Sequence, residues 1–103
     1  MRSRGSSATI GAPTSDSARV SAVDSFAEAN RYMGNHQWNK AEAAYRETLT
    51  LDGSQPTYHA ALGKVLMVLR RWEEAEAEFT AAVLLDLDNP EYRKLVKQAR
   101  SSH

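Results

Sequence analysis

The 103-residue sequence contains no cysteine, and this absence removes several kinds of chemistry at once. Without cysteine there is no disulfide, no thiol nucleophile and no thiolate ligand for a metal ion. The only three histidines are His36, His59 and His103, and their spacing does not match a metal-binding motif on a helix. The sequence therefore predicts no enzyme, no metal site and no cofactor. The lack of cysteine also fits a reducing compartment, and we expect a cytoplasmic protein.

An excess of charge of one sign and long apolar runs are also missing. Thirteen Lys and Arg balance thirteen Asp and Glu, so the formal net charge is zero. Proteins that bind nucleic acid or anionic membranes usually carry a basic excess. No apolar stretch approaches the roughly 20 residues of a membrane span, and the first residues have no apolar segment of the kind found in a secretory signal. We therefore expect neither a nucleic-acid partner nor a membrane.

The chain divides into two parts by composition. Residues 1–20 are rich in Ser, Gly, Ala, Thr and Pro and show no sustained apolar period. Such a segment cannot bury enough surface to offset its ordering entropy. It is predicted to be a flexible N-terminal tail, or a linker if the chain is part of a longer protein. Residues 21–103 are predicted to form one domain.

Apolar residues in the second part recur at the spacing of α-helices. One such set is Tyr58, Leu62, Val65, Leu66 and Leu69. These offsets place the side chains on one face of a helix. No strand-like alternation is present, so the sequence predicts an all-α fold. The five expected helices lie near residues 22–34, 39–52, 56–69, 73–87 and 90–100.

Several helix ends have sequence signals of their own. Ser21 followed by Asp24 resembles a capping box, which predicts the start of the first helix. Asn89 before Pro90 is a good N-cap for the last helix. Gly53 is a plausible stop for the second helix.

The helical part contains an internal repeat. Trp38 and Trp72 occupy equivalent positions in its two copies, so the distance between them along the sequence is the repeat period. The identical pairs without a gap are Ala27/Ala61, Met33/Met67, Trp38/Trp72, Ala41/Ala75, Glu42/Glu76, Ala43/Ala77, Leu51/Leu85, Asp52/Asp86 and Pro56/Pro90. A repeat needs the same packing twice. Both tryptophans are therefore expected to be core residues rather than stacking platforms for a ligand.

A helix-turn-helix unit with this period resembles the tetratricopeptide repeat, whose unit has about 34 residues. The family's small residue four positions before an aromatic is similar to Ala41 with Tyr45 and to Ala75 with Phe79. The resemblance implies a right-handed α-α superhelix. It would contain repeat 1 at 22–55, repeat 2 at 56–89 and a capping helix at 90–100.

Some positions depart from the family pattern. Ser25 and His59 stand where the family has Trp, and Glu28 stands where repeat 2 has Leu62. The polar residues of repeat 1 suit a first helix with no neighbour on its outer side.

In this family the first helix of each repeat lines a concave groove that holds a peptide or a helix of a partner. The resemblance therefore implies a non-enzymatic protein-interaction module, such as a scaffold or a co-chaperone-like adaptor. The implied groove residues are Phe26, Asn30 and Met33 from repeat 1, Ala60, Lys64 and Met67 from repeat 2, and Lys94 from the capping helix. Neighbouring positions on the same face are Gly34, Thr57, Ala61, Val68 and Gln98.

Members of the family that bind chaperone C-termini use a clamp of Lys, Asn and Arg around the terminal carboxylate. Asn30 and Lys94 match that clamp, whereas Phe26, Ala61 and Gln98 replace its other members. The sequence therefore favours an apolar or mixed ligand over a chaperone tail, with the methionines giving adaptable contacts.

Other features of the sequence leave three alternatives to peptide binding in a groove. The repeat surface could mediate self-association, giving a homo-oligomer, or could stack on further repeats of a longer chain. The Glu-rich stretch 73–78 could be a metal or acid-base site, but an exposed helical face is favoured. The basic residues of the last helix could bind phosphate or nucleic acid, but a solvated outer surface of a capping helix is favoured. These are Arg93, Lys94, Lys97 and Arg100.

Overall fold

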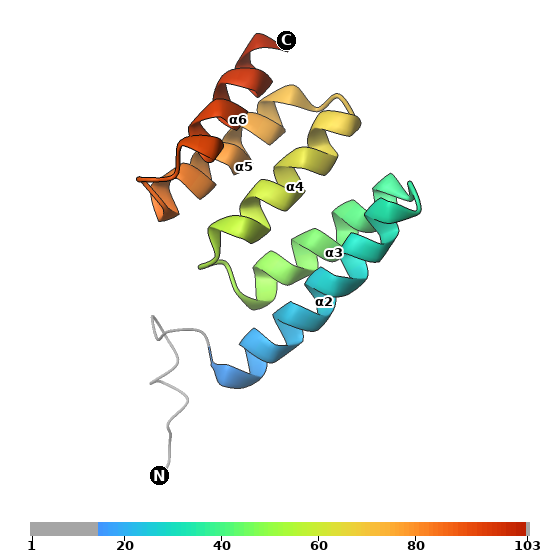
Figure 1. Ribbon diagram of the computed structural model, residues 1–103. Helices are drawn as coiled ribbons and strands as arrows, with labels where there is room; N and C mark the ends of the chain where they lie inside the picture. The colour runs from blue at the N-terminus through green and yellow to red at the C-terminus, as the bar shows by residue number, and fades with distance from the viewer. Residues whose placement is uncertain (1–14, 103) are drawn as a thin grey trace.

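A computed structural model of the chain describes residues 15–102, and in this part it contains five helices and no strand (Figure 1). They are α2 (Asp16–Gly34), α3 (Trp38–Leu51), α4 (Pro56–Val68), α5 (Trp72–Leu85) and α6 (Pro90–Ser101). The predicted all-α fold with these five helices is confirmed. None of the described helices is long and apolar enough to cross a membrane.

The first helix begins earlier than the sequence suggested. Ser15 is its N-cap, and the Ser15 hydroxyl oxygen accepts a hydrogen bond from the Ala18 backbone N–H at 3.1 Å. Asp16 follows in the first turn, where a carboxylate is favoured by the helix dipole. The predicted start at Ser21 was wrong, and so was the predicted tail over 16–20, because capping stabilises this turn although most of its side chains are exposed. Residues 1–14 of the predicted tail lie outside the described residues.

The other helices begin and end within two residues of the predicted positions. Asn89 caps α6, since its side-chain oxygen accepts a hydrogen bond from the Glu91 N–H at 2.9 Å, and Pro90 is the first helical residue. These two residues act as the sequence predicted, because proline lacks the N–H that a helix start leaves free.

The two turns within the repeats have the same backbone geometry. His36 and Arg70, which occupy equivalent positions of the two repeats, both adopt a left-handed conformation, with φ of 59° and 63°. The Gln37 N–H then reaches back to the Tyr32 carbonyl, and the Arg71 N–H reaches back to the Leu66 carbonyl, each at 2.9 Å. This is the Schellman arrangement that satisfies the last carbonyls of a helix. The sequence repeat is therefore also a repeat of conformation.

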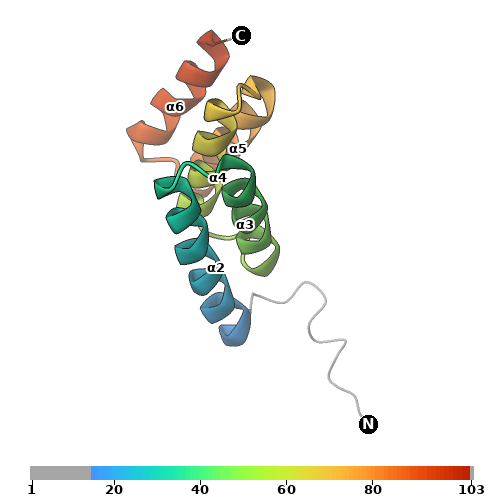
Figure 2. The same cartoon turned by 90° about the vertical axis from the view of Figure 1, so that its right-hand side faces the viewer.

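The helices stack in chain order, so that α2, α4 and α6 follow one side of the molecule and α3 and α5 the other (Figures 1 and 2). The core lies between these two layers and consists mainly of small residues with a few large ones. Ala41 and Ala75 are fully buried at equivalent positions of the two repeats. Small residues there let paired helices approach closely, as the repeat predicted.

Phe79 is the largest fully buried side chain, and its ring lies directly over Gly63 of α4. A Cβ atom at Gly63 would come within 2.4 Å of the Phe79 ring. The prediction that both tryptophans are core residues is supported only in part. Trp38 is half-buried and packs against the core, whereas Trp72 is half-buried and lies outside the core cluster.

An ion pair between Arg71, the residue before α5, and Glu42 of α3 joins the two repeats. Arg71 lies 2.7 Å from Glu42 of α3 and 2.6 Å from Glu74 of α5, counted between nitrogen and carboxylate oxygen. Hydrogen bonding to Arg71 lowers the pKa of Glu74, while hydrogen bonds to Glu74 and Glu42 raise the pKa of Arg71. Part of the Glu-rich stretch therefore works as one side of a junction between repeats.

His59 links the start of α4 to α5. Its Nδ1 lies 2.9 Å from a Glu78 carboxylate oxygen, and its Nε2 lies 3.1 Å from the Gly53 carbonyl. Because both partners are acceptors, the ring satisfies them best when both nitrogens carry a proton. The hydrogen bond to Glu78 is the main cause of a raised His59 pKa, and the Gly53 carbonyl adds to it against the opposite effect of burial.

This arrangement predicts that stability depends on pH near neutrality. A folded-state pKa above the unfolded value means that the stabilisation is complete below about pH 6.5 and is lost as the pH rises through the folded pKa. We expect the free energy of unfolding, measured with urea, to fall as the pH is raised from about 6 to about 8. His59→Gln should remove most of this slope. An unchanged slope in that variant would contradict the assignment.

Candidate peptide-binding groove

The layer formed by α2, α4 and α6 contains a hollow of about 270 Å³. Four of the five described helices contribute side chains to it. The lining residues are Phe26, Asn30 and Met33 from α2, Tyr45 from α3, Thr57, Ala60, Ala61 and Lys64 from α4, and Tyr92 from α6. We call this hollow the groove.

Five of the seven residues named from the sequence line the groove, namely Phe26, Asn30, Met33, Ala60 and Lys64. They come together because α2 and α4 lie on the same side of the stack (Figure 2), where Phe26 of α2 contacts Tyr58 of α4.

The other two predicted residues do not line the groove. Met67 is half-buried and packs against the hydrophobic core, as the groove residues Phe26 and Met33 also do, but it is not among the residues that line the groove. Lys94 is exposed on α6, and Tyr92 is the residue of α6 that reaches the groove.

Sequence reasoning missed two tyrosines in the groove wall. The family pattern indicated Tyr45 only as the aromatic residue that follows Ala41, and no role was predicted for Tyr92. The repeat offers a signal for Tyr92, because it lies one repeat period after Tyr58, at the same position of a first helix. The sequence offers no comparable signal for Tyr45, whose position depends on how α3 packs against α2.

The floor of the groove is held by a hydrogen bond between α2 and α3. The Tyr45 hydroxyl donates to the side-chain oxygen of Asn30 at 2.6 Å. Tyr45 is only 3% exposed, and this burial raises the pKa of its phenol. Since the Asn30 oxygen already accepts this bond, the Asn30 amide group keeps its two N–H donors for a ligand.

Aromatic contacts hold Phe26 in the wall. The Phe26 ring centroid lies 4.8 Å from that of Tyr58 and 5.8 Å from that of Tyr45, with both pairs tilted. Tilted aromatic pairs in this distance range are mutually favourable. The apolar wall is therefore formed before a ligand arrives, and this lowers the ordering cost of binding.

Lys64 is the only charged side chain among the residues that line the groove. It is exposed and lies on α4, beside the small residues Ala60 and Ala61. A pocket that is mainly apolar with a few polar groups suits a ligand with an apolar anchor. The lysine would orient a carboxylate on the same ligand.

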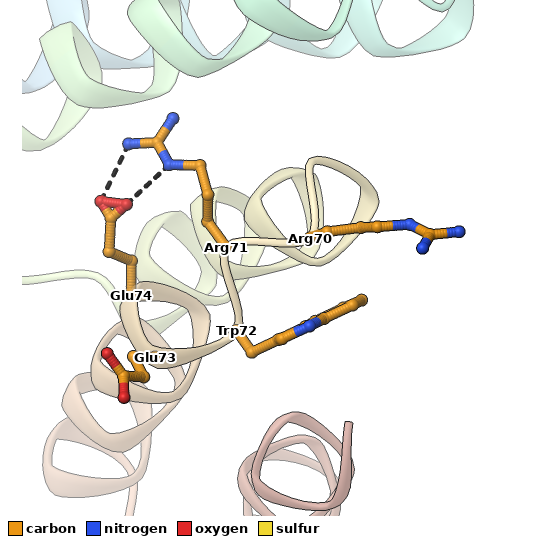
Figure 3. A pocket seen from close by; sticks show the side chains of 5 residues that line it. All are labelled: Arg70, Arg71, Trp72, Glu73 and Glu74. Carbon is orange, nitrogen blue, oxygen red and sulfur yellow. Dashed lines mark hydrogen bonds and ion pairs between the residues drawn. The ribbon is translucent and has the colours of Figure 1, made fainter. Parts of the chain in front are cut away.

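A second hollow, of about 380 Å³, lies at the turn between α4 and α5 (Figure 3). Arg71 and Glu74 point toward each other on one side of it, and Arg70 and Trp72 point together in another direction. Arg71 is already paired with two carboxylates, those of Glu74 and Glu42. This arrangement stabilises the turn and the junction between repeats, so we assign no ligand to it.

Metal binding has no candidate site in the described part of the chain. No group of three or more His, Asp or Glu side chains is placed there to hold a metal ion.

Comparisons with known proteins agree with the geometry. The family model described as tetratricopeptide repeat matches residues 32–99. No protein of curated function matches the sequence significantly. Among solved structures, the TPR domain of Arabidopsis OM64 is similar, with 26% identity and a TM-score of 0.77 over 82% of this chain and 69% of that chain. The first TPR of Spaghetti (RPAP3), bound to the HSP90 peptide SRMEEVD, has 18% identity and a TM-score of 0.78 over 82% of this chain and 67% of that chain.

Proposed function

Because the chain belongs to the tetratricopeptide repeat family, we propose that it is a non-catalytic protein-interaction module whose groove binds a peptide or helix of a partner protein. Tetratricopeptide folds generally mediate interactions between proteins. The observation that carries the proposal is the groove itself, with a pre-formed aromatic wall, an oriented amide at Asn30 and a single cation at Lys64. A scaffold or adaptor in the cytoplasm is the role that we propose for such a module.

We further propose that the ligand carries an apolar side chain beside an acidic group. Phe26 and Tyr92 give the groove its apolar surface, and Lys64 supplies the one charge. A chaperone tail with several carboxylates fits less well, because Phe26 and Ala61 occupy clamp positions and offer no charge or side-chain hydrogen bond to a carboxylate. The HSP90 peptide in the structure of the Spaghetti domain therefore describes that protein rather than the ligand proposed for this one.

Selection of peptides from a random display library on dilute wild-type protein tests this function. We expect the selected peptides to lose at least about tenfold in affinity for Phe26→Glu, because the substitution removes an apolar side chain from the aromatic wall and places a carboxylate there that repels the acidic group of the ligand. The matched control is Ala27→Glu, which adds the same charge at the next residue of α2, at an exposed position outside the groove lining. Isothermal titration calorimetry would measure both affinities. Equal affinities for Phe26→Glu and Ala27→Glu would overturn the groove assignment.

A further inference from the structure

Each end of the helical stack has a hollow on the surface of its terminal helices. The C-terminal end surface, about 310 Å³ in volume, lies between α5 and α6 and is lined by Thr80, Val83, Arg93, Val96, Lys97 and Arg100. The N-terminal end surface, about 290 Å³, lies between α2 and α3 and is lined by Glu28, Tyr32, Lys40, Ala43, Ala44 and Glu47. Neither surface shares a lining residue with the groove.

The C-terminal end surface is basic around an apolar centre. Arg93, Lys97 and Arg100 lie around the half-buried Val83 and Val96. Arg100 is partly neutralised by Glu76, whose carboxylate oxygen lies 3.1 Å away. The Arg93 guanidinium donates to the Leu87 carbonyl and keeps its charge. The surface therefore retains a net positive charge.

The N-terminal end surface has the opposite charge. Glu28 and Glu47 outnumber Lys40, and Asp24 lies one turn before Glu28 on the same side of α2. The apolar part consists of the half-buried Tyr32 with small alanines beside it. The Tyr32 hydroxyl donates to Glu28 at 3.3 Å. This end is therefore an acidic surface around an apolar centre.

We propose that the C-terminal end surface of one chain binds the N-terminal end surface of a second copy, so that chains associate head to tail. Charge complementarity favours this pairing, and it disfavours binding of either surface to its own kind. The contact is heterologous, because two different patches meet, and it allows further copies to add in the same direction. It is independent of peptide binding in the groove.

The junction between the two repeats gives a precedent for such contacts. Within the chain, successive repeats are joined by Arg71 to Glu42 at 2.7 Å and by Arg46 to Glu74 at 3.9 Å. At the N-terminal end, Glu28 occupies the position that the fully buried Leu62 has in repeat 2. The contact between copies therefore relies more on charge and less on apolar burial than the contact within the chain. We expect it to be weak and sensitive to salt.

Sedimentation equilibrium of the full chain tests the proposal. The weight-average mass should rise above 11.4 kDa as the concentration increases, and it should fall back when the ionic strength is raised from about 50 mM to about 500 mM. Two charge-reversal variants separate the surfaces. One is Arg93→Glu with Lys97→Glu, and the other is Glu28→Lys with Glu47→Lys. Each variant alone should sediment as a monomer, because its two ends then carry like charge.

Mixing the two variants is the decisive measurement. Each end of one variant is complementary to the opposite end of the other, so the mixture should regain masses above the monomer. Arg70→Glu with Lys94→Glu makes the same change in net charge as the first variant, at two exposed basic residues outside both end surfaces and the groove, and should associate as the wild type does. Circular dichroism would show that all variants stay folded. A wild type that remains monomeric at every concentration would overturn the proposal, and so would a mixture that stays monomeric.

Discussion

Phe79→Ala is expected to lower the free energy of unfolding by about 3–5 kcal/mol. The Phe79 side chain is fully buried between α5 and α4, and its ring lies over Gly63. Deleting the ring removes its transfer free energy and leaves a cavity that backbone packing closes only in part. Because small domains have about 5–15 kcal/mol of stability in all, this variant should be close to unfolding at room temperature.

Urea unfolding followed by circular dichroism would measure this loss. If Phe79→Ala has no folded baseline, Phe79→Leu keeps most of the volume and should cost less, about 1–1.5 kcal/mol. Leu84→Ala is the control, since Leu84 is on the same helix but 70% exposed, and a change within about 0.5 kcal/mol is expected there. A loss below about 1 kcal/mol for Phe79→Ala would show that the ring does not pack between α4 and α5 as described.

Gly63→Ala is expected to destabilise the protein by about 1–3 kcal/mol, although alanine is the better helix former. The new Cβ would lie 2.4 Å from Cε1 of Phe79, so the ring or the two helices must move apart. Gly34→Ala is the control, because nothing lies within 4 Å of a Cβ placed there. That substitution should be neutral or stabilising by up to about 1 kcal/mol.

Whether Gly63→Ala destabilises or stabilises the protein should depend on the presence of the Phe79 ring. In a Phe79→Ala background the space above Gly63 is empty, and Gly63→Ala should then stabilise the protein by about 1 kcal/mol through helix propensity. Thermal unfolding of the four proteins of this double-mutant cycle would test the contact. If Gly63→Ala changes the free energy of unfolding by the same amount in both backgrounds, α4 does not approach the Phe79 ring as closely as the structure shows.

The helices and their order were predictable because the information lies in short-range patterns that occur twice. Trp38 and Trp72 set the period, and Pro56 and Pro90 mark equivalent helix starts. The start of α2 was not predictable from apolar periodicity, because its first turn is exposed and depends on capping by Ser15. Local hydrogen bonding, rather than burial, decides that boundary.

The candidate site was predictable where it depends on one helical face and not where it depends on packing between helices. Phe26, Asn30 and Met33 share a face of α2 and reach the groove as expected. Met67 was assigned by its repeat position, but it does not line the groove. Tyr45 enters the groove from the opposite layer, through a contact between α2 and α3 that no spacing within either helix encodes.

We propose that the layer formed by α2, α4 and α6, rather than the layer formed by α3 and α5, binds a partner peptide. An NMR titration with a peptide selected on the wild-type protein tests it most directly. We predict that amide and side-chain shifts concentrate at groove residues, with Phe26, Asn30, Lys64 and Tyr92 among the largest. Shifts confined to the outer faces of α3 and α5, with these four residues unchanged, would contradict the account.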